Sequence, residues 1–393
     1  MLPAVRTPAP WLVVAAIVAV ALNLRPLIAA TGPLLDAIQA STGLSDQVAG
    51  LLTTLPILVM GLCALGAAGL QRWLGTARGI TLGMGVVVVA GLLRWIWPTG
   101  TSLVLSAVAA GLGIAVVQAL MPGFIKTARP EAADRLMGLY STGIMGGAVF
   151  AGALSPTVAS HLGWPAVMGL WSLPAALAAL LWHRQSVPAP VPQATVPDTV
   201  EVALWRNGRA WRLMLFFGIG TAAYTLALAW LAPYYLQLGW TPTQSGLLLA
   251  AISAGEVLAG LGVSLAIGRL TDRRWLVWAV LACLAAALVG LLVAPLALVV
   301  PITALLAIGI GALFPLSLII TLDHVADARQ AGALLGFVQG GGYMLASLMP
   351  FVAGLLRGSG HDLSLAWALM LGGVGILVWM ARAFRPGDTL AGR

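Results

Sequence analysis

Arg25 is the first residue of the sequence that could do chemistry, because it is a cation inside a long apolar run. It lies fourteen residues after Trp11, about 21 Å along a helix at 1.5 Å per residue, which is too deep for its side chain to reach either end of the run. Pro26 removes a backbone hydrogen bond, so we expect it to loosen the helix and to free a carbonyl beside Asn23. A guanidinium offers planar, fixed donors that suit a small anion. We therefore predict that Arg25 and Asn23 bind substrate; a permanent pairing of Arg25 with a buried acid or with carbonyls is the alternative.

Glu256 is the second charged residue at such a depth, thirteen residues into the apolar run 243–268. It is a candidate charge partner for Arg25 and a candidate carrier of a coupled proton, since ionisable groups deep in apolar segments commonly mark transport pathways. A structural ion pair or a protonated packing residue is the alternative that the sequence leaves open.

Uncharged polar side chains at comparable depth form a second set of candidates for substrate contact. A buried amide, phenol or indole also commonly bridges two helices, so helix bridging is the alternative for each. The candidates are Gln118, Tyr224, Trp230 and Gln339, with Tyr343 in the same class.

Neither an enzyme site nor a metal site is predicted. Cys63 and Cys283 lie in apolar runs and are expected to be small packing residues. The four histidines lie at loops or span ends, with no Cys/His metal spacing and no nucleophile and base pattern. The glycine-rich stretches lack Gly-Lys-Ser/Thr. We expect no catalytic residue, metal or cofactor.

The elements that position these residues are predicted to be membrane helices. The chain is 60% hydrophobic and 8% charged, with a mean hydropathy of +1.00, whereas soluble domains are roughly a quarter charged. A helix needs about 20 apolar residues to cross a membrane, and continuous runs of this length favour helices over a β-barrel. The first run is too long for a cleaved signal peptide and contains Arg25. We predict an all-α protein with twelve spans, at 11–34, 46–70, 78–97, 101–125, 135–159, 164–182, 210–236, 243–268, 275–295, 299–321, 332–356 and 364–384.

The placement of the basic residues predicts how these helices are oriented. Seventeen of the twenty lie in one set of alternate connections and in the two termini, and the exceptions are Arg25, Arg94 and Arg357. Such asymmetry is typical of cytoplasmic loops, so we expect both termini in the cytoplasm and the protein in the cell inner membrane. The net charge of +8 is then no sign of nucleic-acid binding. Arg94 lies next to Trp95, and we expect it to snorkel to the outer interface.

The chain is expected to consist of two similar halves. A proline-rich linker at 186–208, exposed to the cytoplasm, separates the six spans of 1–185 from the six of 209–393. A shift of 196 residues aligns Gly50-Leu-Leu with Gly246-Leu-Leu. An even number of spans gives both halves the same orientation, so we predict two six-helix bundles with pseudo-two-fold symmetry. Glycine clusters within 135–159 and 332–356 suit close, sliding helix contacts.

One loop resembles a known family signature. Gly268-Arg-Leu-Thr-Asp-Arg-Arg274 resembles the Gly-x-x-x-Asp-Arg/Lys loop of the major facilitator superfamily, whose acid and basic residues cap helix ends at the cytoplasmic gate. The resemblance implies this role for Gly268, Asp272 and Arg273. The equivalent loop of the first half keeps Arg78 but has Thr76 in place of the acid, so no gating ion pair is implied there. The alternative is that these arginines only set orientation.

Further stretches narrow the resemblance to the cyanate porter (CynX/NimT-like) family of this superfamily, over nearly the whole chain. The resemblance implies two bundles around a central cavity that is exposed alternately to each side, and it implies cyanate or nitroimidazole-like compounds as substrates. The stretches are Asn23-Leu-Arg-Pro26 followed by Gly32-Pro33-Leu-Leu, Leu51-Leu-Thr-Thr-Leu-Pro56, Gln118-Ala-Leu-Met-Pro122 with Lys126, and Phe314-Pro315 followed by Leu322-Asp-His324.

These observations predict a secondary transporter of cyanate or a similar small anion, which Arg25 binds. Whether a proton is transported together with the anion stays open at this point. A carrier or exporter of neutral or hydrophobic compounds, with Arg25 locked to Glu256, is the second hypothesis. A membrane scaffold or enzyme that transports nothing is the third. We expect a monomer in contact with membrane lipid, since carriers of this fold usually act alone.

Overall fold

Every regular element of the described residues is a helix. The computed structural model describes residues 10–184, 204–267, 272–325, 328–385 and 387–390. The first group of helices is α1 (Pro10–Leu22), α2 (Pro26–Ala29), α3 (Leu35–Thr42), α4 (Asp46–Leu65), α5 (Ala67–Leu74), α6 (Thr76–Ile96), α7 (Gly100–Ala128), the short η1 (Pro130–Ala132), α8 (Ala133–Leu170) and α9 (Ser172–His183). The second group is α11 (Gly208–Leu226), the π-helical η2 (Ala227–Leu231), α12 (Ala232–Gln237), α13 (Pro242–Ala266), α14 (Arg274–Val293), α15 (Val299–Asp323), α16 (Ala328–Gly358) and α17 (Ser364–Ala381).

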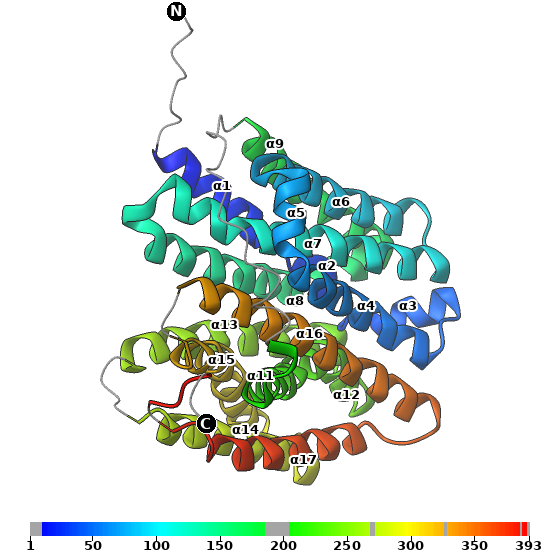
Figure 1. Ribbon diagram of the computed structural model, residues 1–393. Helices are drawn as coiled ribbons and strands as arrows, with labels where there is room; N and C mark the ends of the chain where they lie inside the picture. The colour runs from blue at the N-terminus through cyan, green and yellow to red at the C-terminus, as the bar shows by residue number, and fades with distance from the viewer. Residues whose placement is uncertain (1–9, 185–203, 268–271, 326–327, 386, 391–393) are drawn as a thin grey trace, which may run out of the picture.

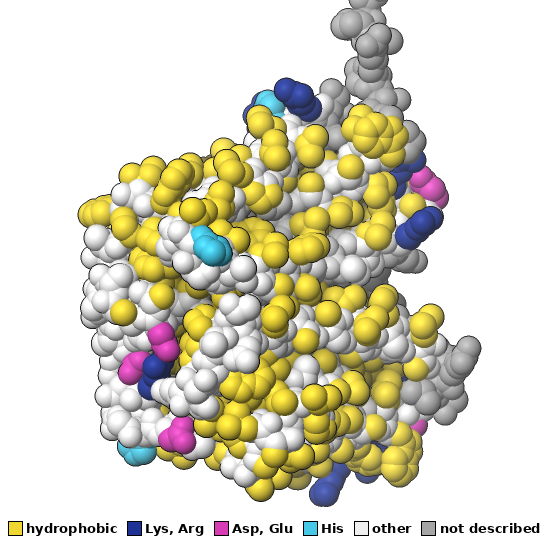
Figure 2. All heavy atoms as spheres, turned by 180° about the vertical axis from the view of Figure 1, so that it is seen from behind, with side chains coloured by type: hydrophobic (Ala, Val, Ile, Leu, Met, Phe, Trp, Pro, Cys, Tyr) yellow, Lys and Arg dark blue, Asp and Glu magenta, His cyan; other side chains and the backbone are white. Residues whose placement is uncertain are grey.

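The chain is a multi-pass membrane protein, as predicted. Eleven helical segments in the described ranges are long and apolar enough to cross a membrane. One of them, Arg135–His183, contains 49 residues and includes two of the predicted spans. It bends at Gly163, whose φ of 78° breaks the helical path within α8. Hydrophobic side chains cover much of the face in Figure 2, as a surface in contact with lipid requires.

The two groups of helices lie one above the other in Figure 1 and meet along two helix pairs, α4 with α16 and α8 with α13. Glycine permits this close approach. A Cβ at Gly50 would lie 2.8 Å from the Pro350 carbonyl oxygen, and one at Gly152 would lie 3.1 Å from the Gly246 carbonyl oxygen. The division into bundles 1–185 and 209–393 stays a prediction, and most of the linker, 185–203, lies outside the described residues.

The first predicted span is interrupted at its polar residues. α1 ends at Leu22, and α2 begins at Pro26, with Arg25 immediately before it. Proline fits the first position of a helix, where no N–H is required, and disfavours helical geometry in the residue before it. The predicted loosening at Pro26 is therefore confirmed. Arg25 therefore lies at an interruption between two helices, inside the first group, and not on the face of a continuous helix.

The equivalent helix of the second group is also irregular, through the π-helical segment Ala227–Leu231. The two irregular segments meet, because a Cβ at Gly32 would lie 2.9 Å from the Leu228 carbonyl oxygen. Non-helical backbone at membrane depth is tolerated where it is buried in protein or lines a cavity. This contact therefore lies between the two groups and not at the lipid surface.

Candidate functional site

A cavity of about 430 Å³ lies between the two groups of helices. Its walls include Met137 and Gly138 at the start of α8 and Leu261 near the end of α13. The contact between Gly152 and Gly246 joins the same two helices beyond the cavity, toward the far end of α8.

The two ends of the molecule need names. We call the side on which α1 begins and α17 ends the terminal face, and we call the side with α3 and the end of α16 the opposite face. The cavity thus lies on the terminal side of the contact between α8 and α13. The polar lining residues are Arg25, Gln118, Ser141, Thr142, Thr221, Tyr224, Glu256, Ser317 and Tyr343.

Arg25 lines this cavity and is 6% exposed. Within the described residues its guanidinium makes no hydrogen bond and no ion pair, and its Nε is buried without a partner. The guanidinium carbon lies 5.6 Å from the centre of the Tyr224 ring, which is cation–π distance. An arginine in apolar surroundings normally has a carboxylate or several carbonyls as partners. Arg25 therefore offers unused donors to whatever occupies the cavity.

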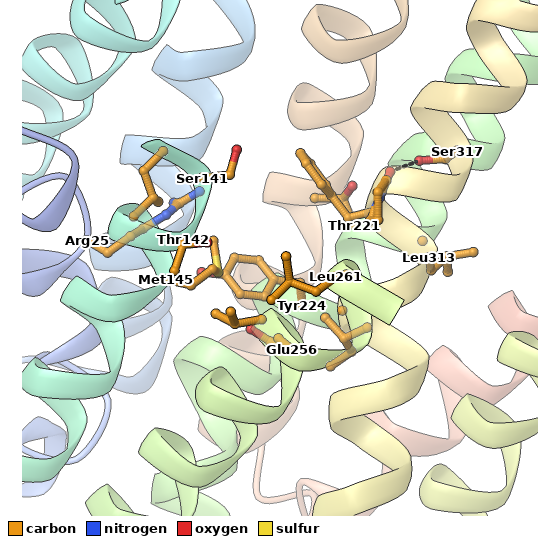
Figure 3. Close-up of a pocket in the computed structure, with 18 of the residues that line it drawn as sticks. Arg25, Ser141, Thr142, Met145, Thr221, Tyr224, Glu256, Leu261, Leu313 and Ser317 are labelled. Carbon is orange, nitrogen blue, oxygen red and sulfur yellow. Dashed lines mark hydrogen bonds between the residues drawn. The ribbon is translucent and has the colours of Figure 1, made fainter. Parts of the chain in front are cut away.

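Glu256 lines the same cavity from α13 and is also 6% exposed. Its Oε2 is buried and has no hydrogen-bond partner among the described residues. Figure 3 shows Arg25 and Glu256 approaching the cavity from different helix groups. No N–O distance between them is within 4.0 Å in the described part of the chain, so they share a cavity without forming the predicted ion pair.

The structure separates the remaining predicted substrate ligands into two sets. Gln118 and Tyr224 line the cavity, whereas Asn23, Trp230 and Gln339 are not among its lining residues. Asn23 Nδ2 donates to the carbonyls of Ala19, at 2.8 Å, and Pro174, at 3.3 Å, and so fastens α1 to α9. Trp230 Nε1 donates to the Pro350 carbonyl at 2.8 Å, which fastens η2 to α16. Helix bridging, the alternative for such residues, describes Asn23 and Trp230.

Tyr140 was not recognised from the sequence, although it lies beside the predicted ligand. It is 4% exposed, and its hydroxyl is buried with no hydrogen-bond partner in the described ranges. It lies within electrostatic range of Arg25, as do Tyr224 and Tyr343. Of the five tyrosines in the chain, these three lie within electrostatic range of one arginine, although Tyr140 is not among the residues that line the cavity. The rarity of tyrosine was the available signal.

Replacing Tyr140 with phenylalanine is expected to leave the folding stability unchanged or raised, because a buried hydroxyl without a partner costs about 1 kcal/mol. The same change should weaken substrate binding about fivefold, because the bound ligand would accept the hydrogen bond of that hydroxyl. Thermal unfolding and substrate titration of the purified variant check the two effects. Tyr234→Phe is the matched control, because Tyr234 donates to the Leu291 carbonyl at 2.9 Å and this variant should lose stability. Unchanged affinity in Tyr140→Phe would remove Tyr140 from the site.

Arg94 does not snorkel to the interface, so that expectation is wrong. It is 1% exposed, and its Nε donates to Ser106 Oγ at 2.9 Å. Its Nη1 donates to the Leu27 carbonyl at 2.8 Å and lies 3.5 Å from Thr31 Oγ1. The carbonyl is available because the helix is interrupted nearby, and Arg94 fixes α2 to α6 and α7. It is a structural residue next to the site.

Two of the predicted gate residues, Asp272 and Arg273, form ion pairs within the second group. Asp272 accepts a hydrogen bond from the Arg274 backbone N–H at 3.0 Å. It also forms an ion pair with Arg274, with Nη2 and Oδ2 2.7 Å apart. The Arg274 side-chain hydrogen bond holds the pKa of Asp272 below its usual range. Arg273 pairs with Asp323 at the end of α15. Arg78 is exposed and makes no ion pair with the residues described, and Gly268 lies outside them.

An ion-pair cluster on the opposite face joins the two groups. Arg357, in the last turn of α16, contacts Asp36 of α3 with Nη2 and Asp46 of α4 with Nε, each at 3.4 Å. Its guanidinium carbon lies 5.6 Å from the centre of the Trp230 ring. Gln39 donates to the same Asp46 oxygen, Oδ1, at 3.0 Å. One arginine thus holds two acids of the other group, which favours closure of the opposite face.

Removing this arginine is expected to open the opposite face. Partly exposed ion pairs contribute about 0.5 kcal/mol each, so Arg357→Gln should raise the fraction of molecules with a separated opposite face about fivefold. Spin labels at Ala40 and His361, both exposed on that face, measure the separation. Arg382→Gln is the control, since Arg382 is exposed and has no ion pair in the described part of the chain. Identical distance distributions in the two variants would contradict the closing role.

Comparisons with known proteins agree with this architecture. Residues 12–347 match the sequence profile of the Major Facilitator Superfamily. The chain is 33% identical over 353 residues to the cyanate transport protein CynX of Escherichia coli (strain K12), covering 90% of this chain and 91% of the relative. It is 30% identical over 374 residues to the 2-nitroimidazole transporter of the same organism, covering 94% and 93%. The resemblance drawn from the sequence motifs is thereby confirmed.

Solved structures share the fold at low sequence identity. A D-xylose-proton symporter has a TM-score of 0.77 at 12% identity, covering 94% of this chain and 97% of that one. A bacterial homologue of the human lysosomal transporter Spinster has a TM-score of 0.75 at 17% identity, covering 96% of each chain. These similarities confirm the fold that the loop signature implied. At such low sequence identity they show the fold alone.

Proposed function

We propose, for a chain that belongs to the major facilitator superfamily, that it is a secondary transporter which moves cyanate or a similar small anion by alternating access. A member of this superfamily is a transporter and not an enzyme. In our proposal it lies in the cell inner membrane with both termini and the terminal face in the cytoplasm, and it acts as a monomer.

The observation that carries the proposal is the guanidinium of Arg25, which lines a cavity between the two groups of helices and has no hydrogen bond or ion pair among the described residues. Placing an arginine in apolar surroundings costs about 3 kcal/mol on insertion scales, and a bound monoanion offsets this cost by supplying the missing acceptors. The hydroxyls of Ser141 and Thr142 line the same cavity and can add further donors. Donors predominate around Arg25, so an anion fits better than a cation. The 33% identical relative that is a cyanate transport protein supports the same substrate.

A planar heterocycle such as 2-nitroimidazole is the second candidate. The cavity is much larger than a three-atom anion, and Met145, Phe217, Leu261 and Phe314 give it apolar walls. Such walls are typical of sites for ring compounds. The 30% identical relative is a 2-nitroimidazole transporter.

Glu256 is proposed to carry a coupled proton when the anion binds. Arg25 and Glu256 face one cavity without an ion pair between them in the described ranges, so a monoanion at Arg25 would lie near the carboxylate. Protonation of Glu256 removes this repulsion between like charges. The transported anion and one proton would then cross the membrane together.

Counterflow in proteoliposomes tests the proposal. Vesicles loaded with unlabelled cyanate should accumulate labelled cyanate above the level of empty vesicles, and excess external cyanate should abolish the signal. Exchange of labelled 2-nitroimidazole with no exchange of cyanate would establish the second candidate in its place. Exchange of neither compound would overturn both.

A further inference from the structure

Tyr224 lines the same cavity as the two buried charged residues, Arg25 and Glu256. Its ring centre is 5.6 Å from the Arg25 guanidinium, and its phenol is within electrostatic range of both Arg25 and Glu256. In the view of Figure 3 the Tyr224 ring is drawn to the right of Arg25 and above Glu256. We infer that Tyr224 is a spacer, a positioning residue whose ring prevents Arg25 from pairing with Glu256 and thereby keeps the guanidinium available to an anion. This inference rests on the proposed function.

The backbone on either side of the ring is fixed. Thr225, the next residue on α11, donates from Oγ1 to the Ala346 carbonyl at 2.9 Å and so fastens α11 to α16. Behind Glu256, a Cβ at Gly311 would lie 2.5 Å from the Glu256 carbonyl oxygen, so α13 and α15 are closely packed there. Tyr224 and Glu256 are therefore held in place by one group of helices, whereas Arg25 comes from the other.

The ring and not the hydroxyl is the part that separates the charges. The Tyr224 hydroxyl has no hydrogen-bond partner in the described part of the chain, so no hydrogen bond is needed to place it. The face of the ring attracts the guanidinium weakly through its quadrupole. Opposite charges in a medium of low dielectric constant attract each other far more strongly than a cation attracts a ring. Without the ring, Arg25 and Glu256 would form an ion pair that competes with the incoming anion.

Four variants separate the spacer role from direct ligand contact. Cyanate affinity is measured by titration of the purified protein for Tyr224→Phe, Tyr224→Ala, Glu256→Gln and the double variant Tyr224→Ala/Glu256→Gln. If the ion pair forms in nine-tenths of the Tyr224→Ala molecules, the apparent Kd rises about tenfold, because only the unpaired fraction binds. Tyr224→Phe should stay within about threefold of the unmodified protein, because it keeps the ring. The double variant should recover the affinity of Glu256→Gln, because Arg25 then has no charged partner.

Two results would overturn the spacer. A double variant as weak as Tyr224→Ala means that the ring itself contacts the anion, and a Tyr224→Phe as weak as Tyr224→Ala means that the hydroxyl is the essential part. A readout without substrate keeps the inference distinct from the proposed function. In ligand-free protein, Glu256→Gln should leave the melting temperature unchanged when Tyr224 is present and should lower it in the Tyr224→Ala background, where an ion pair is lost. If the unmodified protein does not bind cyanate but this pattern of melting temperatures is observed, the proposed function is refuted and the spacer is supported. If the pattern of melting temperatures is absent, the spacer is refuted.

Discussion

Replacing Arg25 with alanine is expected to reduce cyanate counterflow at least about 100-fold, because it removes two charge-assisted hydrogen bonds worth about 1.5 kcal/mol each from the bound anion. The same change should leave the melting temperature unchanged or raised. Arg25 makes no hydrogen bond or ion pair with the described residues and already borders a cavity, so its removal breaks only the weak cation–π contact with Tyr224. Counterflow in proteoliposomes and thermal unfolding of the same preparation measure the two effects.

Arg25→Lys refines this test. An ammonium keeps the charge but lacks the planar pair of donors, so we expect partial activity in the lysine variant. Undiminished flux in Arg25→Ala would show that the anion does not need the guanidinium. A large loss of stability in the alanine variant would show that Arg25 has a structural partner and would remove the basis of the proposal.

The burial of Arg25 and Glu256 could be predicted from the sequence, and so could the break at Pro26. Both follow from local rules, namely the rise per residue along a helix and the missing N–H of proline. The loop around Asp272 identified the superfamily for the same reason, since it is a pattern in a short stretch of chain. None of these inferences requires knowing which helices are neighbours.

The partners of the deep polar groups could not be predicted, because they come from distant helices. Asn23 lies two residues before Arg25 but donates to the Pro174 carbonyl, and Trp230 donates to the Pro350 carbonyl. These helices are apolar on every side, so hydrophobic periodicity does not tell which face is turned inward. Tyr140 was missed for the same reason. The apolar runs therefore indicated which polar residues are buried, and packing decided which of these side chains face the cavity.

Arg94 shows how much such distant partners matter, and Arg94→Ala is expected to destabilise the protein severely. The substitution removes hydrogen bonds to Ser106 and to the Leu27 carbonyl and leaves a void in a place where the arginine is 1% exposed. Lost hydrogen bonds from a charged donor cost about 1.5 to 3 kcal/mol each, and the void adds to this. We expect a loss of at least about 3 kcal/mol, measured as a fall in the melting temperature and in the yield of monodisperse protein.

Arg25→Ala is the matched control for this prediction, because the same side chain is removed at a site where it has no hydrogen bond to the described residues. The two alanine variants should therefore separate cleanly, one losing transport with its stability intact and the other losing stability first. Arg94 also holds the Leu27 carbonyl, two residues after Arg25, so any folded Arg94→Ala should bind the anion more weakly as α2 loosens. An Arg94→Ala protein as stable as Arg25→Ala would instead mean that Arg94 reaches the membrane interface, as the neighbouring Trp95 first indicated.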